Sequence, residues 1–548
     1  MFSRLKEFKN KKQLLGFITH DMGDIITFFV IDSISETFVT SKTYQSENTK
    51  ELLDDIPALK DSFKAIIIDL FQLKLNLTPY HVSYKFCEEL REVLKKQKIP
   101  NYFISEETYL FTSLLTTAKM DLKFDEIVLM ILPHKSNTPK YVRTSYDLTI
   151  GEFKFTPKGY QLIRQRDVSS LNVKATPEFL QRQICDGKNA PQNVIIASFY
   201  CKKIPFKKIF KSSNNLIILE KGLEWYRQGF LIETCKWLLD KSYIKYYILP
   251  VSVRSLHVYG FFGTDHNVMD ILKIDVYEPL PITKKANFVK SLPQLHIIFK
   301  DRISKYGTQT ELPADCHGFE ITVTIDEENF DEIDIPQMAL KNFEKLPRKL
   351  NFMLESKKIP FIGFFDNSSV IGIYNEPQGY EFLKEWNGMY GTDCFISFDQ
   401  KKIKYGQEAM KMMLTKNTFV VFDILKIMSM PPNDIKTNPS WGFKFTKDCN
   451  NPVLLQFDNF DGTIKEASPA FLMALFLRQH LKTIQEKIGE KPNEIALWVL
   501  KQRFSEAENK RIKEGLEAAC KLLKTDCCYV DTDGFDSDFI KSCINNLL

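Results

Sequence analysis

Two distant stretches of this chain share one order: an apolar run, a helical pattern and a second apolar run. In the first stretch, residues 65–69 (AIIID) and 101–104 (NYFI) flank a helix that begins with Thr78 as N-cap and Pro79 as first helical residue, and that extends to about Lys98. This order predicts a β-α-β unit, in which a helix joins two parallel strands.

The second stretch lies near the other end of the chain. Residues 495–499 (IALWV) and 527–530 (CCYV) flank a helix that begins with the capping box of Ser505 and Glu508 and ends near Lys524. The two units are offset by roughly four hundred residues, which indicates an internal repeat. We expect them to superpose, each with its helix packed on a mixed sheet that a nearby hairpin extends.

Each unit has such a hairpin close to it. Residues 14–18 and 25–31 are apolar runs on either side of HDMGD (20–24). Residues 361–365 and 370–374 flank Asp366-Asn367-Ser368-Ser369, whose short polar side chains favour a turn. Both patterns predict β-hairpins.

Clear start and stop residues predict a further helix before the second β-α-β unit. Ser468 and Pro469 begin it, and Gly489 is its C-cap. The residues expected on its apolar face are Leu477, Leu481, Ile484 and Ile488.

Composition limits the class of protein. The 548 residues are 44% hydrophobic and 26% charged, as in folded proteins of about two to four domains. A net charge of +5 is too small over this length to argue for nucleic-acid binding, and no apolar run is long enough to cross a bilayer. Eleven cysteines without C-x-x-C spacing favour reduced thiols, with adjacent Cys527 and Cys528 on opposite faces of a strand. We expect a cytoplasmic protein that binds neither nucleic acid nor membrane.

The 361–374 hairpin and the segments after it (395–398, 403–409 and 417–426) resemble the opening of the 70-kilodalton heat-shock chaperone family. Residues 104–118 and 146–155 are similar to that family's passage into its second ATPase lobe, and residues 193–210 to its adenosine-side strand and helix. Residues 295–302 and 318–335 resemble its substrate-binding β-sandwich. The resemblance implies an α/β fold of actin-like (ribonuclease-H-like) ATPase lobes with mixed sheets, plus an all-β sandwich domain.

The resemblance also implies a division into four parts. Residues 1–120 form an abbreviated first lobe, and residues 121–245 a second lobe that lacks most of one subdomain. Residues 246–340 form the sandwich, without a helical lid, and residues 341–548 form a second, truncated copy of the first lobe.

The residues at the family's nucleotide motifs differ from the family pattern. Gly363 stands at the metal-side acid of the first phosphate loop and Phe365 at its glycine, followed by Asp366 and Asn367. Pro133 and His134 occupy the second phosphate loop, within LPHKS (132–136), and Phe199 and Tyr200 replace paired glycines on the adenosine side. Glycine serves at such places because a side chain blocks the approach of backbone amides to phosphate.

These differences predict that no cofactor is bound and that ATP is not hydrolysed. Losing some four phosphate contacts removes about 6 kcal/mol, on the order of ten-thousand-fold in affinity. Restoring one residue, as in Phe365→Gly, is expected to leave turnover undetectable.

Other candidate catalytic groups have simpler interpretations. Asp366 is expected to cap a turn rather than hold a metal, because its neighbours supply no further ligand. Lys426 is one residue from the family's catalytic lysine, which aligns with Leu425, and is expected to be an exposed lysine. Asp315-Cys316-His317 resembles a nucleophile pair in composition only, since three consecutive residues do not converge on one point.

Three functions follow as hypotheses. The first is a chaperone-like pseudo-ATPase that holds apolar protein segments or partners another chaperone. The second is an ATP-binding and magnesium-binding chaperone, or an exchange-factor-like protein, with a cleft rebuilt from the two copies. The third is a decaying gene copy without a dedicated role, which would not yield folded protein.

Overall fold

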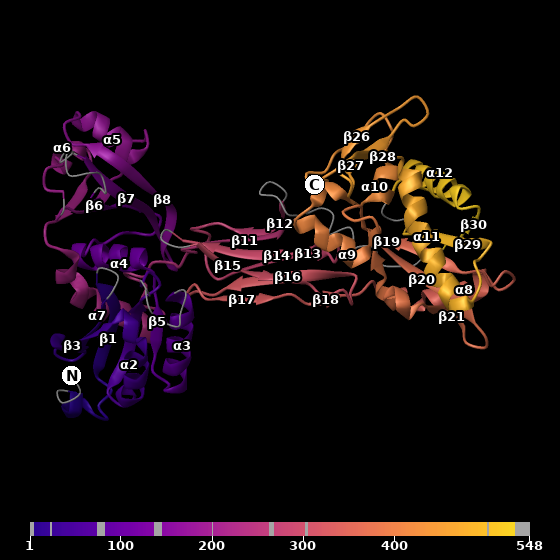
Figure 1. The fold of residues 1–548 in the computed structure, drawn as a ribbon. Coiled ribbons are helices and arrows are strands. Elements are labelled where there is room, and N and C mark those ends of the chain that lie inside the picture. Colours follow the sequence, from indigo (N-terminus) through magenta and orange to yellow (C-terminus); the bar gives the residue numbers. More distant parts are fainter. Residues whose placement is uncertain are drawn as a thin grey trace.

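The computed structural model describes residues 5–21, 25–73, 83–135, 145–199, 201–261, 268–301, 305–365, 367–500 and 504–531. The protein is mixed α/β, and its three parts lie in a row (Figure 1). We call them the N-terminal unit (5–245), the middle unit (246–340) and the C-terminal unit (341–531).

The N-terminal unit begins with a five-stranded sheet in the order β3-β2-β1-β4-β5. β1, β2 and β3 are antiparallel, whereas β1, β4 and β5 are parallel, so the sheet is mixed. Its strands are β1 (Leu14–Asp21), β2 (Ile25–Asp32), β3 (Thr37–Gln45), β4 (Phe63–Asp69) and β5 (Asn101–Phe103). The predicted hairpin is confirmed, but Asp21 pairs with Ile25, so the expected 20–24 turn is shorter than the sequence suggested.

β4 is buried along almost its whole length because helices cover both faces of the sheet. On one face, α3 (Ser83–Lys96) contributes Phe86 and Leu90 to a core with Ile66. α2 (Thr49–Asp55) adds Leu52 to the same core. β4, α3 and β5 form the first predicted β-α-β unit, and the expected N-cap residues Thr78 and Pro79 lie outside the described residues.

A second five-stranded sheet follows with the same strand plan. Read from its antiparallel edge the order is β8-β7-β6-β9-β10, with β6, β9 and β10 parallel. Its strands are β6 (Ile127–Lys135), β7 (Ser145–Thr156), β8 (Gly159–Asn172), β9 (Asn193–Ala197) and β10 (Asn215–Leu219). α5 (Pro177–Cys185) is the connection between β8 and β9, and α6 (Phe206–Ile209) joins β9 to β10.

α7 (Arg227–Leu239) follows the second sheet in sequence but packs on the first sheet. Its Phe230 and Trp237 share a core with Phe17 of β1 and Ile67 of β4. α4 (Glu106–Ala118) lies beside α7 and links the two sheets. Residues 121–245, expected as a separate lobe, therefore depend on the first sheet for the packing of their last helix.

The C-terminal unit contains the same strand plan a third time, in the order β21-β20-β19-β29-β30. The strands are β19 (Phe361–Phe365), β20 (Ser368–Asn375), β21 (Gly379–Phe382), β29 (Glu494–Val499) and β30 (Asp526–Tyr529), and the helices beside them are α8 (Leu346–Met353) and α12 (Glu506–Leu522). β29, α12 and β30 are the second predicted β-α-β unit, and the capping box of Ser505 and Glu508 is confirmed. Cys527 and Cys528 pack against different cores, as expected for opposite faces.

A long insertion between β21 and β29 distinguishes this sheet from the other two. It contributes β22 (Thr392–Asp393), which pairs with β20 as a sixth strand of the sheet. It also holds two small sheets and three α-helices: β23 (Ile396–Ser397), β24 (Lys404–Tyr405), β25 (Val420–Val421), β26 (Lys444–Thr446), β27 (Leu454–Asp458), β28 (Ile464–Ala467), α9 (Gly406–Lys411), α10 (Ile424–Ser429) and α11 (Pro469–Ile488). The predicted caps of α11 are confirmed, with Ser468 accepting from Phe471 N and Gly489 at φ +90°. Ile488 was expected on the apolar face but is 39% exposed, because the last turn extends beyond the core that holds Ile484.

The middle unit consists of two antiparallel four-stranded sheets. One contains β11 (Ser255–Phe261), β12 (Val268–Ile274), β14 (Leu295–Lys300) and β15 (Lys305–Thr310), and the other β13 (Ile282–Val289), β16 (Gly318–Ile325), β17 (Asp331–Asp334) and β18 (Gln337–Met338). Buried residues of both sheets, such as Val258 and Ile321, share one core. In the described part of 246–340 there is no helix.

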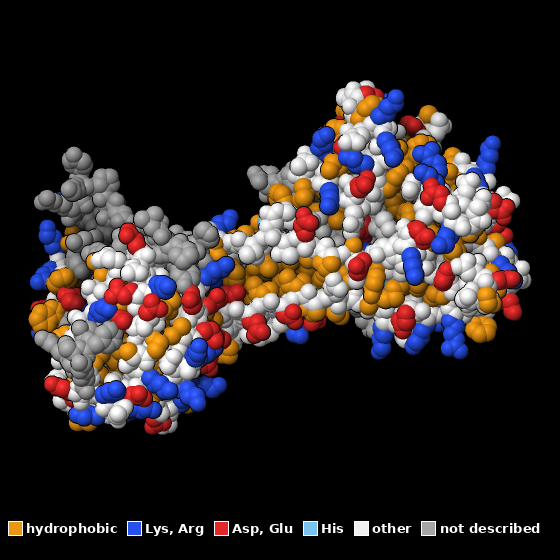
Figure 2. Space-filling model, turned by 60° about the horizontal axis from the view of Figure 1, so that its bottom comes forward, with side chains coloured by type: hydrophobic (Ala, Val, Ile, Leu, Met, Phe, Trp, Pro, Cys, Tyr) orange, Lys and Arg blue, Asp and Glu red, His pale blue; other side chains and the backbone are white. Residues whose placement is uncertain are grey.

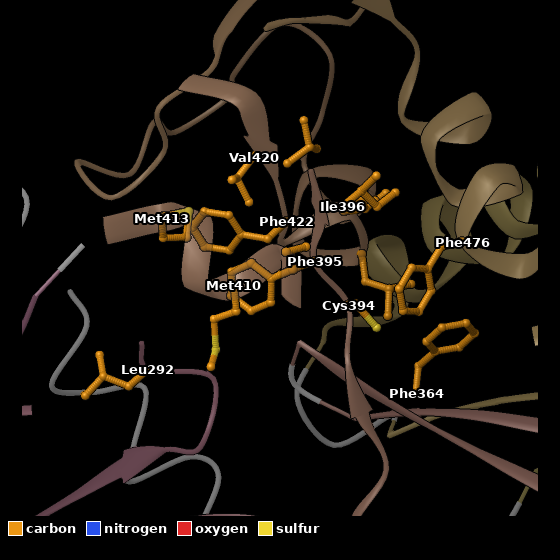
Figure 3. Close-up of a cluster of buried hydrophobic side chains, with 14 of the residues drawn as sticks. Leu292, Phe364, Cys394, Phe395, Ile396, Met410, Met413, Val420, Phe422 and Phe476 are labelled. Atoms are coloured by element: carbon orange, nitrogen blue, oxygen red, sulfur yellow. The ribbon is translucent and has the colours of Figure 1, made fainter. Parts of the chain in front are cut away.

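The core of the middle unit continues into the C-terminal unit. Leu292, at the end of the middle unit, belongs to the same cluster as Met410 and Phe422 of the insertion (Figure 3). The two units are therefore packed as one body. In the part of the chain that the structure describes, no helix is long and apolar enough to cross a membrane.

Candidate functional site

Phe365 ends β19 at the first expected phosphate loop, and its side chain is only 2% exposed. The ring lies 5.1 Å from the ring of His317 of the middle unit and 5.4 Å from that of Phe343, between centroids. An aromatic core thus fills the place where the family pattern has a glycine that admits phosphate.

Gly363, two residues earlier, leaves little room for the acidic side chain of the family pattern. A Cβ built there would lie 3.0 Å from the ring of Phe361 and 3.0 Å from Val370 of the paired strand. Such contacts are tighter than ordinary van der Waals packing, so an acid at 363 would displace its neighbours.

The turn after β19 is shorter than predicted. Ser368 and Ser369 were expected in it but begin β20, because Phe365 already pairs with Ser368. Asn367 occupies the turn, where its carbonyl oxygen accepts from Cys394 N (2.7 Å) and its Oδ1 from Asp423 N (3.0 Å). Asp366 lies outside the described residues. The two oxygens of Asn367 thus bind this turn to the insertion, whereas its buried Nδ2 has no hydrogen-bond partner among the described residues.

A buried polar network joins the hairpin to the middle unit. Asp393 Oδ1 accepts from Ser368 Oγ at 2.7 Å and from Ser291 Oγ of the middle unit at 2.8 Å. Lys290 Nζ donates to Gly391 O at 2.9 Å, and all four side chains are buried. Buried polar groups paired in this way fix the relative position of the segments that carry them.

Two buried histidines lie beside this network. His317 Nε2 donates to Met389 O (2.9 Å), and its Nδ1 accepts from Leu340 N (3.0 Å). His480 of α11 donates from Nδ1 to Phe476 O, and its Nε2 lies 2.9 Å from Ser369 Oγ. Burial lowers the pKa of each imidazole to about 4, so both are neutral near pH 7.

Of the other expected nucleotide positions, residues 132–135 lie in a strand rather than in a loop. β6 continues through residues 132–135, with Pro133 opposite Leu148 and His134 opposite Asp147, so the loop expected at 132–136 is wrong up to Lys135. A strand persists there because β7 pairs with each of these residues. Phe199, after β9, is 41% exposed, and Tyr200 lies outside the described residues.

The remaining candidate groups do not form a catalytic cluster. Lys426 is a partly exposed residue of α10, next to the buried Leu425. Asp315 is exposed, whereas Cys316 Sγ donates to Pro313 O and His317 points to Met389. Burial raises the pKa of the Cys316 thiol to about 11, which leaves it protonated and weakly nucleophilic. Among the described residues no group of three or more His, Cys, Asp or Glu side chains could hold a metal ion.

A cavity of about 360 Å³ lies where the N-terminal unit meets the middle unit. Its walls are mainly apolar, and exposed Lys273 and Lys300 lie on its solvent side. The apolar residues of its lining are Phe111, Phe153, Leu162, Ile248, Leu249, Val251, Val253 and Val276. A volume of this size falls in the range of small-ligand sites and accommodates one or two large apolar side chains.

Gln165 of β8 lines the same cavity, and its Nε2 is buried without a hydrogen-bond partner. A buried donor without a partner costs free energy, so an acceptor supplied by a ligand would stabilise it. This site could not be predicted from the sequence, because its walls come from α4, β7, β8 and residues 248–255, 273–277 and 300–301, which are distant in the chain.

Charged contacts also join the N-terminal unit to the middle unit. Arg254 is 1% exposed, pairs with Asp331, and lies with its guanidinium carbon 3.8 Å from the ring centroid of Tyr84 in α3. Arg91 of α3 reaches Asp326 and Glu328 of the middle unit at 2.6 and 2.9 Å. These contacts hold the two units together beside the cavity.

The residues at the first phosphate position do not fit a nucleotide, because a side chain at 363 would displace buried neighbours and the buried ring of Phe365 fills the place of the glycine. The alternative of a cleft rebuilt from the two copies would need the N-terminal and C-terminal units to lie against each other. The middle unit lies between the N-terminal and C-terminal units (Figure 1). No protein-family model matches the chain.

Proposed function

We propose that this protein is a chaperone-like pseudo-ATPase of the heat shock protein 70 type, which holds apolar segments of other proteins without turning over ATP. Its lobes are actin-like in this proposal, and its middle unit is a β-sandwich that serves as the substrate domain. Three sheets with one strand plan, two of them before and one after a pair of antiparallel sheets, support this assignment.

The observation that carries the proposal is the packing of Phe365. Phosphoryl transfer depends on positioned charge around the phosphate groups. At the position of the phosphate-binding glycine, this chain has a ring buried against His317 of the middle unit. What would be a nucleotide contact is thus an internal contact between units.

Binding of an extended segment is supported by the middle unit. β15 is an edge strand of its sheet, so its outer backbone groups are open to strand addition. Figure 2 shows hydrophobic side chains gathered along the middle unit between the two ends. The junction cavity gives a nearby pocket for a large apolar side chain. Since the described part of this unit has no helix to cover a bound segment, exchange should be fast, within seconds.

The test has two arms on the full-length chain. Calorimetric titration of magnesium-ATP is expected to give no saturable heat, and Phe365→Gly is expected to restore none. A fluorescein-labelled apolar peptide is expected to bind by anisotropy and to exchange within seconds.

Two results would contradict the proposal. One is ATP turnover by the unmodified chain that disappears in an Asp366→Ala, Lys426→Ala double variant, since a working site would then survive. The other is a lack of apolar-peptide binding by chain that is shown to be folded. Release over minutes would refute the open site.

A further inference from the structure

A groove lies on the C-terminal unit, apart from the hairpin and the junction cavity. It has a volume of about 770 Å³ and lies between the β23–β24 turn, one face of α11 and the segment after α11. Six cationic side chains from these three places line it: Lys401, Lys402, Lys404, Arg478, Lys482 and Lys491. Glu408 is the one carboxylate among the lining residues.

The positive charge of the groove is only partly balanced inside the chain. Lys404 pairs with Asp399 at 3.0 Å, and Lys482 with Glu486 at 3.7 Å. Lys401 and Lys402 are exposed and form no ion pair within the described ranges.

The lining thus carries five more positive than negative side chains, which equals the formal net charge of the entire chain. Like charges held on one concave surface repel one another, and an anionic ligand relieves this repulsion. We propose that this groove binds an acidic segment, rich in Asp and Glu, of a partner polypeptide.

The lining of the groove favours a polypeptide over other anions. Its six cations come from three separate segments, residues 401–404, 478–482 and 491, whereas a single phosphate group requires convergent donors. Tyr405 is the one aromatic residue of the lining, so the groove lacks the row of rings on which the bases of single-stranded nucleic acid stack. Ile403, Leu481 and Leu523 give it an apolar floor that suits a peptide backbone and its methylene groups.

This inference is independent of the proposed function. No residue of the groove lines the junction cavity, and none belongs to the middle unit. Apolar-peptide binding, measured on the same variants, therefore reports on the proposed function separately.

The test uses fluorescein-labelled oligoglutamate and the full-length chain at low ionic strength. The variant Lys401→Glu, Lys402→Glu reverses two lining charges, and Lys436→Glu, Lys447→Glu makes the same change in net charge at exposed lysines outside the groove. We expect the wild type to bind, the first variant to bind at least about tenfold more weakly, and the second to stay within about twofold. Added salt should weaken binding by the wild type.

Three outcomes would overturn the proposal: no binding by the wild type, equal losses in both variants, or displacement of the peptide by inorganic phosphate or single-stranded DNA at lower concentrations than by unlabelled oligoglutamate. Far-UV circular dichroism of both variants checks that each is folded. All substituted lysines are exposed, so folding should be unaffected.

Discussion

The middle unit meets its two neighbours in different ways. Towards the C-terminal unit its hydrophobic core is continuous, and the buried network around Asp393 crosses the boundary. Towards the N-terminal unit the apolar contact is smaller: Phe330 is buried in the core of the first sheet, and beside it lie a cavity of about 360 Å³ and the charged contacts of Arg91 and Arg254.

This difference indicates where the molecule can adjust. Close packing has few alternative arrangements, whereas a cavity removes contacts that would otherwise resist movement. We therefore expect the middle and C-terminal units to act as one body, and the N-terminal junction to open locally at lower free energy. A ligand in the cavity would stiffen the adjustable junction.

Lowering the pH should produce the largest loss of stability, and this loss should occur at the junction of the middle and C-terminal units. His317 and His480 have folded-state pKa values of about 4, against 6.5 for an ordinary histidine, because burial disfavours the charged form. The contribution of these two neutral histidines to stability is fully present above about pH 6.5 and is lost as the pH falls through 4. Between these two pH values only the unfolded chain takes up the protons. Each histidine should contribute roughly 3 kcal/mol to this loss.

Urea unfolding between pH 7 and pH 4 measures this loss, and hydrogen exchange locates it in the C-terminal unit. A His317→Gln, His480→Gln variant should show a smaller slope with pH than the wild type. Equal slopes in the two proteins would mean that the buried imidazoles are not responsible.

Removing the carboxylate of Asp393 should produce the second-largest loss of stability. Asp393→Ala leaves the buried hydroxyls of Ser291 and Ser368 without their acceptor, so we expect a loss of about 2–4 kcal/mol. Hydrogen exchange in residues 361–393 should accelerate. The exposed Asp315→Ala serves as control and should change stability by less than about 0.5 kcal/mol.

A smaller effect is expected at the opposite junction. Arg91→Ala removes two ion pairs and a contact with the ring of Phe330, at a side chain 21% exposed, so about 1–2 kcal/mol should be lost. Exchange should accelerate in residues 326–331 and stay unchanged in residues 390–393. If both segments accelerate alike, the two junctions are coupled and the contrast fails.

The smallest change should occur in the cavity wall. Gln165→Leu removes the buried donor that has no partner and adds apolar surface, so the free energy of unfolding should rise by up to about 1 kcal/mol. Thermal unfolding compares it with Gln161→Leu, an exposed change on the same strand. A clear loss of stability in Gln165→Leu would show that the amide of Gln165 has a hydrogen-bond partner.

Local signals predicted much of the fold. The caps at Ser468, Ser505 and Gly489 depend on a few adjacent residues, and so do the two β-hairpins, which is why each was placed correctly. The errors lie where tertiary pairing extends an element, as when β6 continues through Lys135.

The candidate sites were much less accessible to prediction. That Phe365 replaces a glycine is visible in the sequence, but its partner His317 lies far away in the chain. Ser291 and Asp393 are 102 residues apart, and each looks like an ordinary polar residue of a turn. The basic groove could not be predicted because its cations come from three segments that only the fold brings together, although residues 401–404 (KKIK) are basic in the sequence.

The strands of the middle unit run lengthwise between the two end units (Figure 1). Their interstrand hydrogen bonds are therefore perpendicular to the line that joins the ends. Tension applied between the end units would load these bonds in shear, so that many must break together rather than one after another. The middle unit should therefore resist tension between the end units. Under force, the contacts around Arg91 should break before the sheets of the middle unit do.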